Sequence, residues 1–187
     1  MKIACYTALV GDYDNLLDPA YTTDEWDYIC FTNQKISESK WDIRPLQHII
    51  AKDPTRTNRW HKLNPHILFP DYDYSIYIDA NIQICGPHLE TKVNDFCDRN
   101  ILMSLPLHPF RNCIYKEINE CILLKTDELT RIRSLVDIFH SDRFPYEMGL
   151  FENNVIFRKH FKKQKNFLQR RMGNAQRQCQ RLHLDPF

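Results

Sequence analysis

The chain has 187 residues, a length that suits one domain better than two. A chain of this size buries about 70% of its unfolded surface, so it needs neither disulfides nor a metal to fold. Its net charge of +1 provides no global field that would recruit nucleic acid or a membrane. We therefore expect a soluble globular protein without nucleic acid as a partner.

The numbers and spacing of cysteine and glycine residues exclude several kinds of metal, redox and nucleotide-binding site. The seven cysteines are odd in number and contain no Cys-x-x-Cys pair, which argues against zinc-ribbon and thioredoxin-like sites. We predict reduced, mostly buried thiols in a cytoplasmic protein. The four glycines form neither Gly-x-Gly-x-x-Gly nor a Walker loop, and Gly-x-Ser-x-Gly and His-Glu-x-x-His are missing too. Any nucleotide must therefore bind without a glycine-rich cradle.

The first third of the chain predicts short strands. Residues 2–10 form a continuous apolar run, too short to span a membrane and typical of a strand covered on both faces. Further short strands are predicted over residues 28–32 and 41–44.

A helix and the clearest strand follow. Asp53-Pro54-Thr55 is a helix-start signal ahead of residues 56–69, and Pro65 is expected to kink or split that helix. Residues 74–82 then form the strongest central-strand pattern in the chain.

The remaining elements complete an alternating order. We predict a helix over residues 88–100, a buried strand over 101–105, helical spacing over 112–140, a short strand over 153–157 and a basic helix over 160–171. This alternation favours an α/β, Rossmann-like fold with a mostly parallel mixed sheet flanked by helices.

The most informative polar residues end the strand Tyr77-Ile78-Asp79-Ala80-Asn81. Ligands bind beyond the carboxyl ends of strands in open α/β sheets. On a continuing strand, Asp79 and Asn81 leave on the same side, where both oxygens reach one hard cation. Mn²⁺ or Mg²⁺ there would bridge a diphosphate and neutralise the leaving group. The alternative is a strand that merely ends in an Asx turn.

Basic residues on the predicted helix form a candidate phosphate clamp. Arg56, Arg59 and Lys62 follow one another at intervals of three residues and share a broad helix face. Arginine forks match phosphate oxygens in bidentate fashion. The alternative is a solvated basic face.

Two later loops carry further candidates. His108 and Arg111 follow a predicted strand, where they would contact the donor sugar or the acceptor, although a lone histidine is more often structural. Glu147 and Glu152 flank Gly149, and either carboxylate would serve as the base of an inverting transfer or bind sugar hydroxyls. The residues alone do not choose between the two, and an exposed turn is the alternative.

Five ordered segments carry a resemblance that covers roughly residues 3–165. They are residues 6–14, 56–66, 75–81, 108–117 and 146–155. Together they resemble a family of GT-A-type glycosyltransferases found in bacteria and in plant mucilage biosynthesis, long filed as a domain of unknown function.

The resemblance implies a GT-A fold and transfer of a sugar from a nucleotide-sugar donor, of the uridine diphosphate type, to a glycan or lipid-linked acceptor. It implies Mn²⁺ or Mg²⁺ at Asp79 and Asn81. In such folds the first strand and loop hold the nucleobase and ribose. By resemblance the donor contacts here include Thr7, Ala8, Tyr13 and Asp14.

The C-terminal stretch departs from the family, which continues with paired tryptophans and an Arg-Asp-Gln segment. Residues 170–181 are instead basic, glutamine-rich and almost without apolar periodicity, which indicates an altered or truncated C-terminus. We expect a glycosyltransferase-like domain over residues 1–172 and a poorly ordered tail over 173–187.

The same region leaves two questions open. Lys162, Lys163 and Arg170 are candidates for peripheral membrane contact, with a solvated helix end as the alternative. The altered C-terminus also leaves a second hypothesis, a catalytically weak nucleotide-binding or interaction module with the same fold.

Overall fold

The computed structural model describes residues 1–12, 14–125 and 128–161. The described residues divide into two compact units. The sheet unit comprises residues 1–104 and 154–161, and the hairpin unit comprises residues 105–153. Both lie inside the domain predicted over residues 1–172, whose end and predicted tail fall outside the described residues.

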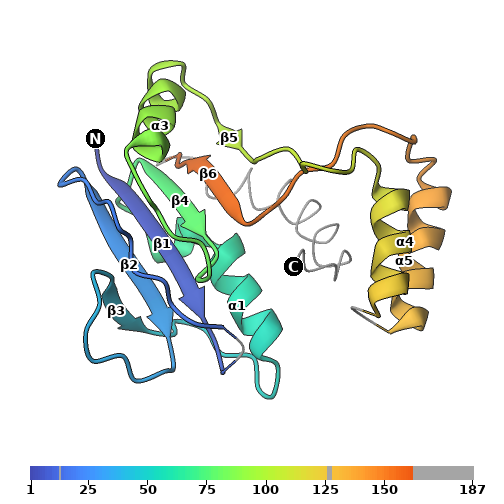
Figure 1. The fold of residues 1–187 in the computed structure, drawn as a ribbon, viewed down its shortest axis with the longest axis horizontal. Coiled ribbons are helices and arrows are strands. Elements are labelled where there is room, and N and C mark those ends of the chain that lie inside the picture. Colours follow the sequence, from blue (N-terminus) through green and yellow to red (C-terminus); the bar gives the residue numbers. More distant parts are fainter. Residues whose placement is uncertain (13, 126–127, 162–187) are drawn as a thin grey trace. The chain divides into compact units, whose positions relative to one another are not determined.

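The sheet unit is built on one mixed sheet with the strand order β3-β2-β1-β4-β6-β5 (Figure 1). The strands are β1 (Ile3–Leu9), β2 (Trp26–Thr32), β3 (Asp42–Pro45), β4 (Tyr74–Ile78), β5 (Met103–Ser104) and β6 (Val155–Lys159). β1 pairs in parallel with β2 and β4, and β2 pairs in parallel with β3. β6 runs antiparallel to both β4 and β5. The predicted α/β class with a mostly parallel mixed sheet is confirmed.

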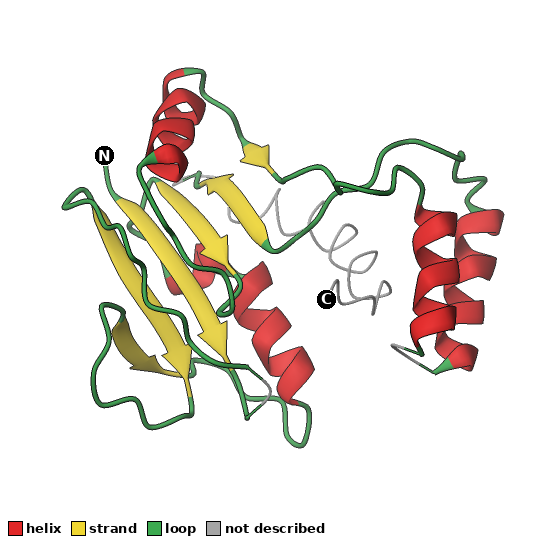
Figure 2. Cartoon of the chain, in the orientation of Figure 1, coloured by secondary structure: helices red, strands yellow, loops and turns green. Residues whose placement is uncertain are grey.

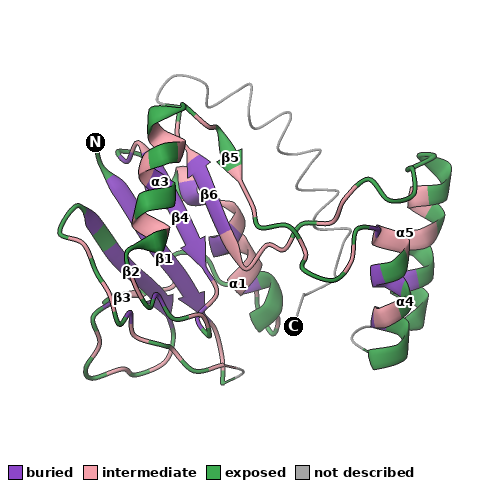
Figure 3. Ribbon diagram, turned by 45° about the horizontal axis from the view of Figure 1, so that its top comes forward, coloured by how far each residue is buried: buried purple, intermediate pink, exposed green. Residues whose placement is uncertain are grey.

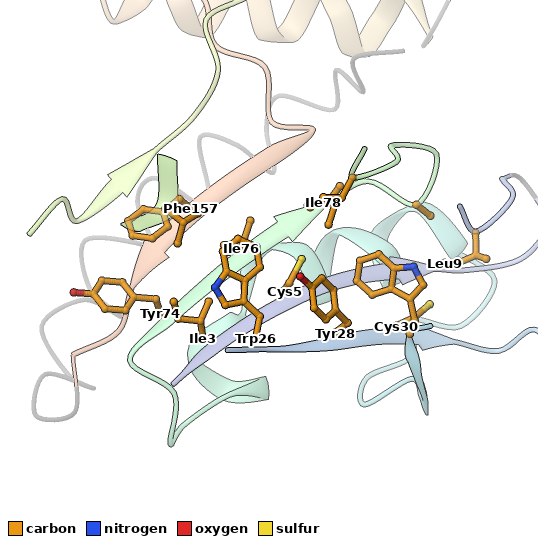
Figure 4. Packing of buried hydrophobic residues seen from close by; sticks show 14 residues of the cluster. Ile3, Cys5, Leu9, Trp26, Tyr28, Cys30, Tyr74, Ile76, Ile78 and Phe157 are labelled. Carbon is orange, nitrogen blue, oxygen red and sulfur yellow. The ribbon is translucent and has the colours of Figure 1, made fainter. Parts of the chain in front are cut away.

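Helices cover both faces of this sheet, so β1 is buried at every residue. α3 (His88–Asp98) covers one face, where its Phe96 ring lies 5.2 Å from that of Phe157. α1 (Pro54–Leu63) and α2 (Pro65–Leu68) cover the other face. The core on the α3 side includes Ile3, Cys5, Trp26, Tyr28, Ile76 and Phe157 (Figure 4).

The predicted break at Pro65 is confirmed, and it shapes the contacts below α1. Because the helix stops at Leu63, the carbonyl of Lys62 is available to other donors. Tyr6 Oη donates to it at 3.0 Å and Arg158 Nη1 at 2.9 Å. The buried Arg158 cation therefore lies at the negative end of the α1 dipole. These bonds fasten the end of α1 to β1 and β6.

Two predicted strands are wrong in extent. The strand predicted over residues 74–82 ends at Ile78, because the Ile82 amide donates to the Asp79 carbonyl at 3.0 Å and closes a turn. The strand predicted as buried over residues 101–105 reduces to β5 at the edge of the sheet, where Met103 is 51% exposed. An edge strand has a neighbour on one side only, so apolar residues in it need not be buried.

The hairpin unit contains two helices, α4 (Ile114–Leu124) and α5 (Leu129–Ser141), which lie side by side (Figure 2). Ile118, Cys121 and Ile132 form its small buried cluster. Figure 3 shows the contrast between the units: β1, β4 and β6 are largely purple, whereas much of α5 is green. The helical spacing predicted over residues 112–140 thus corresponds to two helices.

Several expectations concern cysteines and membranes. None of the six cysteines in the described residues forms a disulfide, and Cys5, Cys30, Cys113 and Cys121 are buried, as predicted. None of the helices that the structure describes is long and apolar enough to cross a membrane. Lys162, Lys163 and Arg170, the candidates for membrane contact, lie outside the described residues.

Candidate functional site

The carboxyl ends of β1, β2 and β4 meet at one edge of the sheet unit, because these strands run parallel. The loop after β1 turns at Gly11, whose φ of +72° favours glycine. Asn33 Oδ1 accepts from the Gly11 amide at 3.0 Å, and Gln34 Nε2 donates to the Gly11 carbonyl at 2.5 Å. The loop after β2 therefore fixes the loop after β1.

The residues that the resemblance assigned to nucleobase and ribose lie on β1 and in this loop. Thr7 and Ala8 are buried, and the Ala8 carbonyl accepts from Asn58 Nδ2 at 2.6 Å. Asp14 is half-buried, and Tyr13 lies outside the described residues. Since the side chains of Thr7 and Ala8 are covered, donor contact in this region would fall to backbone atoms and the loop. The assignment stays a prediction.

Asp79 lies directly after β4 and is held at three points. Its amide donates to the Asn154 carbonyl at 2.9 Å, and its own carbonyl closes the turn with Ile82. Lys62 Nζ of α1 lies 3.0 Å from Asp79 Oδ1 and 4.8 Å from the centre of the Tyr77 ring. The Lys62 side chain is 10% exposed and that of Asp79 is 26% exposed. The ion pair is thus largely shielded but reaches the surface at its carboxylate end.

The alternation argument that placed Asp79 and Asn81 on one side of a strand is wrong, because both belong to the turn of residues 79–82. Their chemistry still fits a hard cation in part. No described residue donates a hydrogen bond to Asp79 Oδ2, and Asn81 is exposed. Within the described ranges, no three His, Cys, Asp or Glu side chains are placed to hold a metal. The two residues therefore fit Mn²⁺ or Mg²⁺ only where phosphate oxygens and water complete the coordination.

The three residues of the predicted basic face of α1 have different surroundings in the structure. Arg56 is exposed, and its Nε lies 3.3 Å from Oδ2 of Asp53, the N-cap residue. Arg59 is half-buried, and Lys62 reaches the strand ends, where it contacts Asp79. Asn58 joins Lys62 there, a residue that the sequence reasoning missed. Its position four residues before Lys62, on the same helix stripe, was the available signal.

Histidines pack beneath α1 and α2, on the face opposite α3. His61 is fully buried: its Nδ1 lies 2.8 Å from the Thr57 carbonyl, and its Nε2 accepts from the Gln47 amide at 2.9 Å. Burial lowers the pKa of His61, of His66 and of His160. The lowered pKa values favour the neutral form of all three rings, and His61 and His66 were not among the predicted site residues.

Other predicted residues belong to the hairpin unit, where His108 and Arg111 do come together. His108 Nδ1 accepts from the amides of Phe110 at 3.1 Å and Arg111 at 2.9 Å. Arg111 Nε donates to Glu117, and Arg111 Nη2 lies 3.1 Å from His108 Nε2. Glu117, a buried carboxylate that sequence reasoning missed, thus organises this cluster. A contact of His108 or Arg111 with the donor stays a prediction.

The two candidate bases differ in their surroundings. Glu147 has a φ of +57°, and its Oε1 lies 2.9 Å from Lys116 Nζ. Glu152 is half-buried, and its amide donates to the Pro106 carbonyl at 3.0 Å. The left-handed backbone of Glu147 costs about 1–3 kcal/mol and is a feature enriched at functional sites. Neither carboxylate is thereby assigned as the base.

Comparison with known proteins identifies the family. The family model of the TOD1/MUCI70 glycosyltransferase-like domain matches residues 2–169. No curated protein and no solved structure matched the chain. The matched range contains all five segments of the resemblance and ends before the predicted tail.

Proposed function

The chain belongs to the TOD1/MUCI70 family of glycosyltransferase-like domains, and we propose that it transfers a sugar from a uridine diphosphate sugar to a glycan or lipid-linked acceptor. The observation that carries the proposal is the ion pair of Lys62 and Asp79 at the carboxyl edge of the parallel strands. Ligands bind at this edge in open α/β sheets. Charges of both signs therefore lie where a diphosphate would be held.

The reaction breaks the bond between the anomeric carbon of the sugar and the diphosphate oxygen, and an acceptor hydroxyl oxygen makes the new bond. Negative charge grows on the leaving diphosphate, so a cation held nearby lowers the barrier. The Lys62 ammonium would be such a cation, because bonds from Asn58 and to the Lys62 carbonyl tie α1 to β1 and keep the base of the lysine side chain near the strand ends. A Mn²⁺ or Mg²⁺ ion held by Asp79 and Asn81 would act as a Lewis acid on the same oxygens when bound.

The remaining roles complete the proposal. The loop of residues 10–14 would hold the nucleobase and ribose, and Arg56 and Arg59 would contact phosphate oxygens. His108 and Arg111 would bind the donor sugar. Glu147 or Glu152 would accept the proton of the acceptor hydroxyl if the transfer inverts the anomeric centre.

Nucleotide binding gives the first test. Uridine diphosphate with Mn²⁺, at a hundredfold excess over the dissociation constant, would stabilise the fold by about 2.7 kcal/mol. A domain of this size would then melt several degrees higher. Asp79→Asn is expected to remove the Mn²⁺-dependent part of the shift, whereas Asp71→Asn, with the same charge change at an exposed position, is expected to keep it. An unchanged melting curve at millimolar nucleotide and metal would contradict donor binding.

A further inference from the structure

Lys62 is a lysine in a setting that lysines rarely occupy. The residue is 8% exposed, and burying an ammonium group costs several kcal/mol unless an anion and hydrogen bonds compensate. Its Nζ finds the anion in Asp79 at 3.0 Å and a π-face in Tyr77 at 4.8 Å. The carboxylate that would attract a divalent cation therefore already has a positive partner inside the protein.

The backbone of Lys62 is held by hydrogen bonds, whereas its side chain can change conformation and move the ammonium group. The Lys62 carbonyl is bonded to Tyr6 and Arg158, and Asn58 ties the preceding turn of α1 to β1. The four-carbon stem beyond these anchors is flexible. Asp79, its partner, is 26% exposed at the side chain, so the pair meets the surface at the strand ends. A bound diphosphate would offer the ammonium a second anion within a short swing of the same stem.

We propose that Lys62 is a positioning residue that makes metal binding conditional on the nucleotide. In the nucleotide-free protein its ammonium neutralises Asp79 and repels a divalent cation from that carboxylate. When a diphosphate arrives, the ammonium moves to phosphate oxygens and leaves Asp79 to the metal. Nucleotide and metal then bind with positive coupling, each raising the affinity for the other by the same factor. The coupling rests on the proposed function, whereas the repulsion of the metal does not.

The test measures Mn²⁺ binding directly, by electron paramagnetic resonance of free Mn²⁺, with and without uridine diphosphate. Lys62→Met is expected to tighten Mn²⁺ binding to the nucleotide-free protein about tenfold, since like charges a few ångströms apart repel strongly at a shielded site. It is also expected to weaken metal-free binding of uridine diphosphate about tenfold, measured by calorimetry, because a charged contact is lost. Lys62→Gln repeats the test with a polar side chain if the methionine variant does not fold.

Matched variants test whether the change in Mn²⁺ affinity arises at Asp79. Lys92→Met removes the same charge from an exposed position on α3 and is expected to leave Mn²⁺ affinity unchanged. Adding Asp79→Asn to Lys62→Met is expected to abolish the gained affinity, which places the ion at Asp79. Equal Mn²⁺ affinity in the wild-type, Lys62→Met and Lys62→Gln proteins would overturn the proposal. A gain of Mn²⁺ affinity without any nucleotide binding would support the repulsion by Lys62 and refute the proposed function.

Discussion

The ion pair of Lys62 and Asp79 makes a thermodynamic prediction that needs no ligand. In a double-mutant cycle, Lys62→Met and Asp79→Asn are made singly and together, and their interaction is the departure from additivity. A hydrogen bond between charged groups contributes about 1.5–3 kcal/mol to stability. Because the Asp79 side chain is 26% exposed, we take the lower part of that range and expect a coupling of about 1.5–2 kcal/mol.

The two single changes are expected to be unequal. Asp79→Asn removes a carboxylate from beside a lysine side chain that is only 10% exposed, whereas Lys62→Met leaves a carboxylate that meets solvent. Removing the partner of the more deeply buried charge is the more costly change. We therefore expect Asp79→Asn to lower the free energy of unfolding by about 2–3 kcal/mol, and Lys62→Met by less.

Urea melts followed by tryptophan fluorescence measure this cycle cleanly. The three tryptophans, Trp26, Trp41 and Trp60, all belong to the sheet unit, so the signal reports on the unit that holds the ion pair. The exposed pair of Asp95 and Arg99 on and just after α3 supplies a control cycle, with an expected coupling below about 0.5 kcal/mol. The reasoning is refuted if the Lys62–Asp79 coupling is no larger than that of the control.

Two further predictions concern the sheet unit. Acidification from pH 7.5 to 5.5 should lower its stability, because the folded-state pKa values of His61, His66 and His160 lie below the ordinary value. The unfolded chain then takes up protons first, so the stabilisation is complete above about pH 6.5 and is lost as the pH falls below it. Urea melts at both pH values should show that His61→Gln loses less free energy of unfolding on acidification than the wild type does. If the stability of the wild type does not depend on pH, the inference that these histidines are neutral in the folded state is wrong. Gly11→Ala should cost about 1–2 kcal/mol from its left-handed backbone alone, since the added Cβ would meet Pro54 at an ordinary 3.7 Å; an unchanged melting temperature would show that the loop adopts another conformation.

Apolar runs and proline allowed the main elements to be predicted from sequence. The strand at residues 2–10, the helix at 88–100 and the break at Pro65 each appear within a few residues of their predicted positions. The end of β4 could not be predicted, because Ile82 continues the apolar pattern yet returns to the core through a turn. The antiparallel direction of β6 could not be predicted either, since the pattern of apolar residues indicates which positions are buried but not which way a strand runs.

The candidate site was predictable in its residue types more than in its contacts. Asp79 could be predicted as a site residue, because an aspartate that directly follows an apolar strand lies at the carboxyl edge of a parallel sheet, where ligands bind. The burial of Lys62 depends on a partner 17 residues away, on a different element. Glu117 was missed because its contact with Arg111 forms only when the loop before α4 packs against the helix. Asn58 could have been included, because it lies on the same helix stripe as Lys62, although its bond to the Ala8 carbonyl depends on tertiary packing.

Release of uridine diphosphate from a panel of uridine diphosphate sugars tests the central claim most directly. The proposed function predicts time-dependent release from at least one donor in the presence of Mn²⁺, with transfer to water or to an added glycan acceptor, and at least a hundredfold slower release by Asp79→Asn, as expected for loss of a main electrostatic contribution. Saturable nucleotide binding without release from any donor, with the wild type and Asp79→Asn equally inactive, would contradict the transferase and leave a nucleotide-binding module with the same fold.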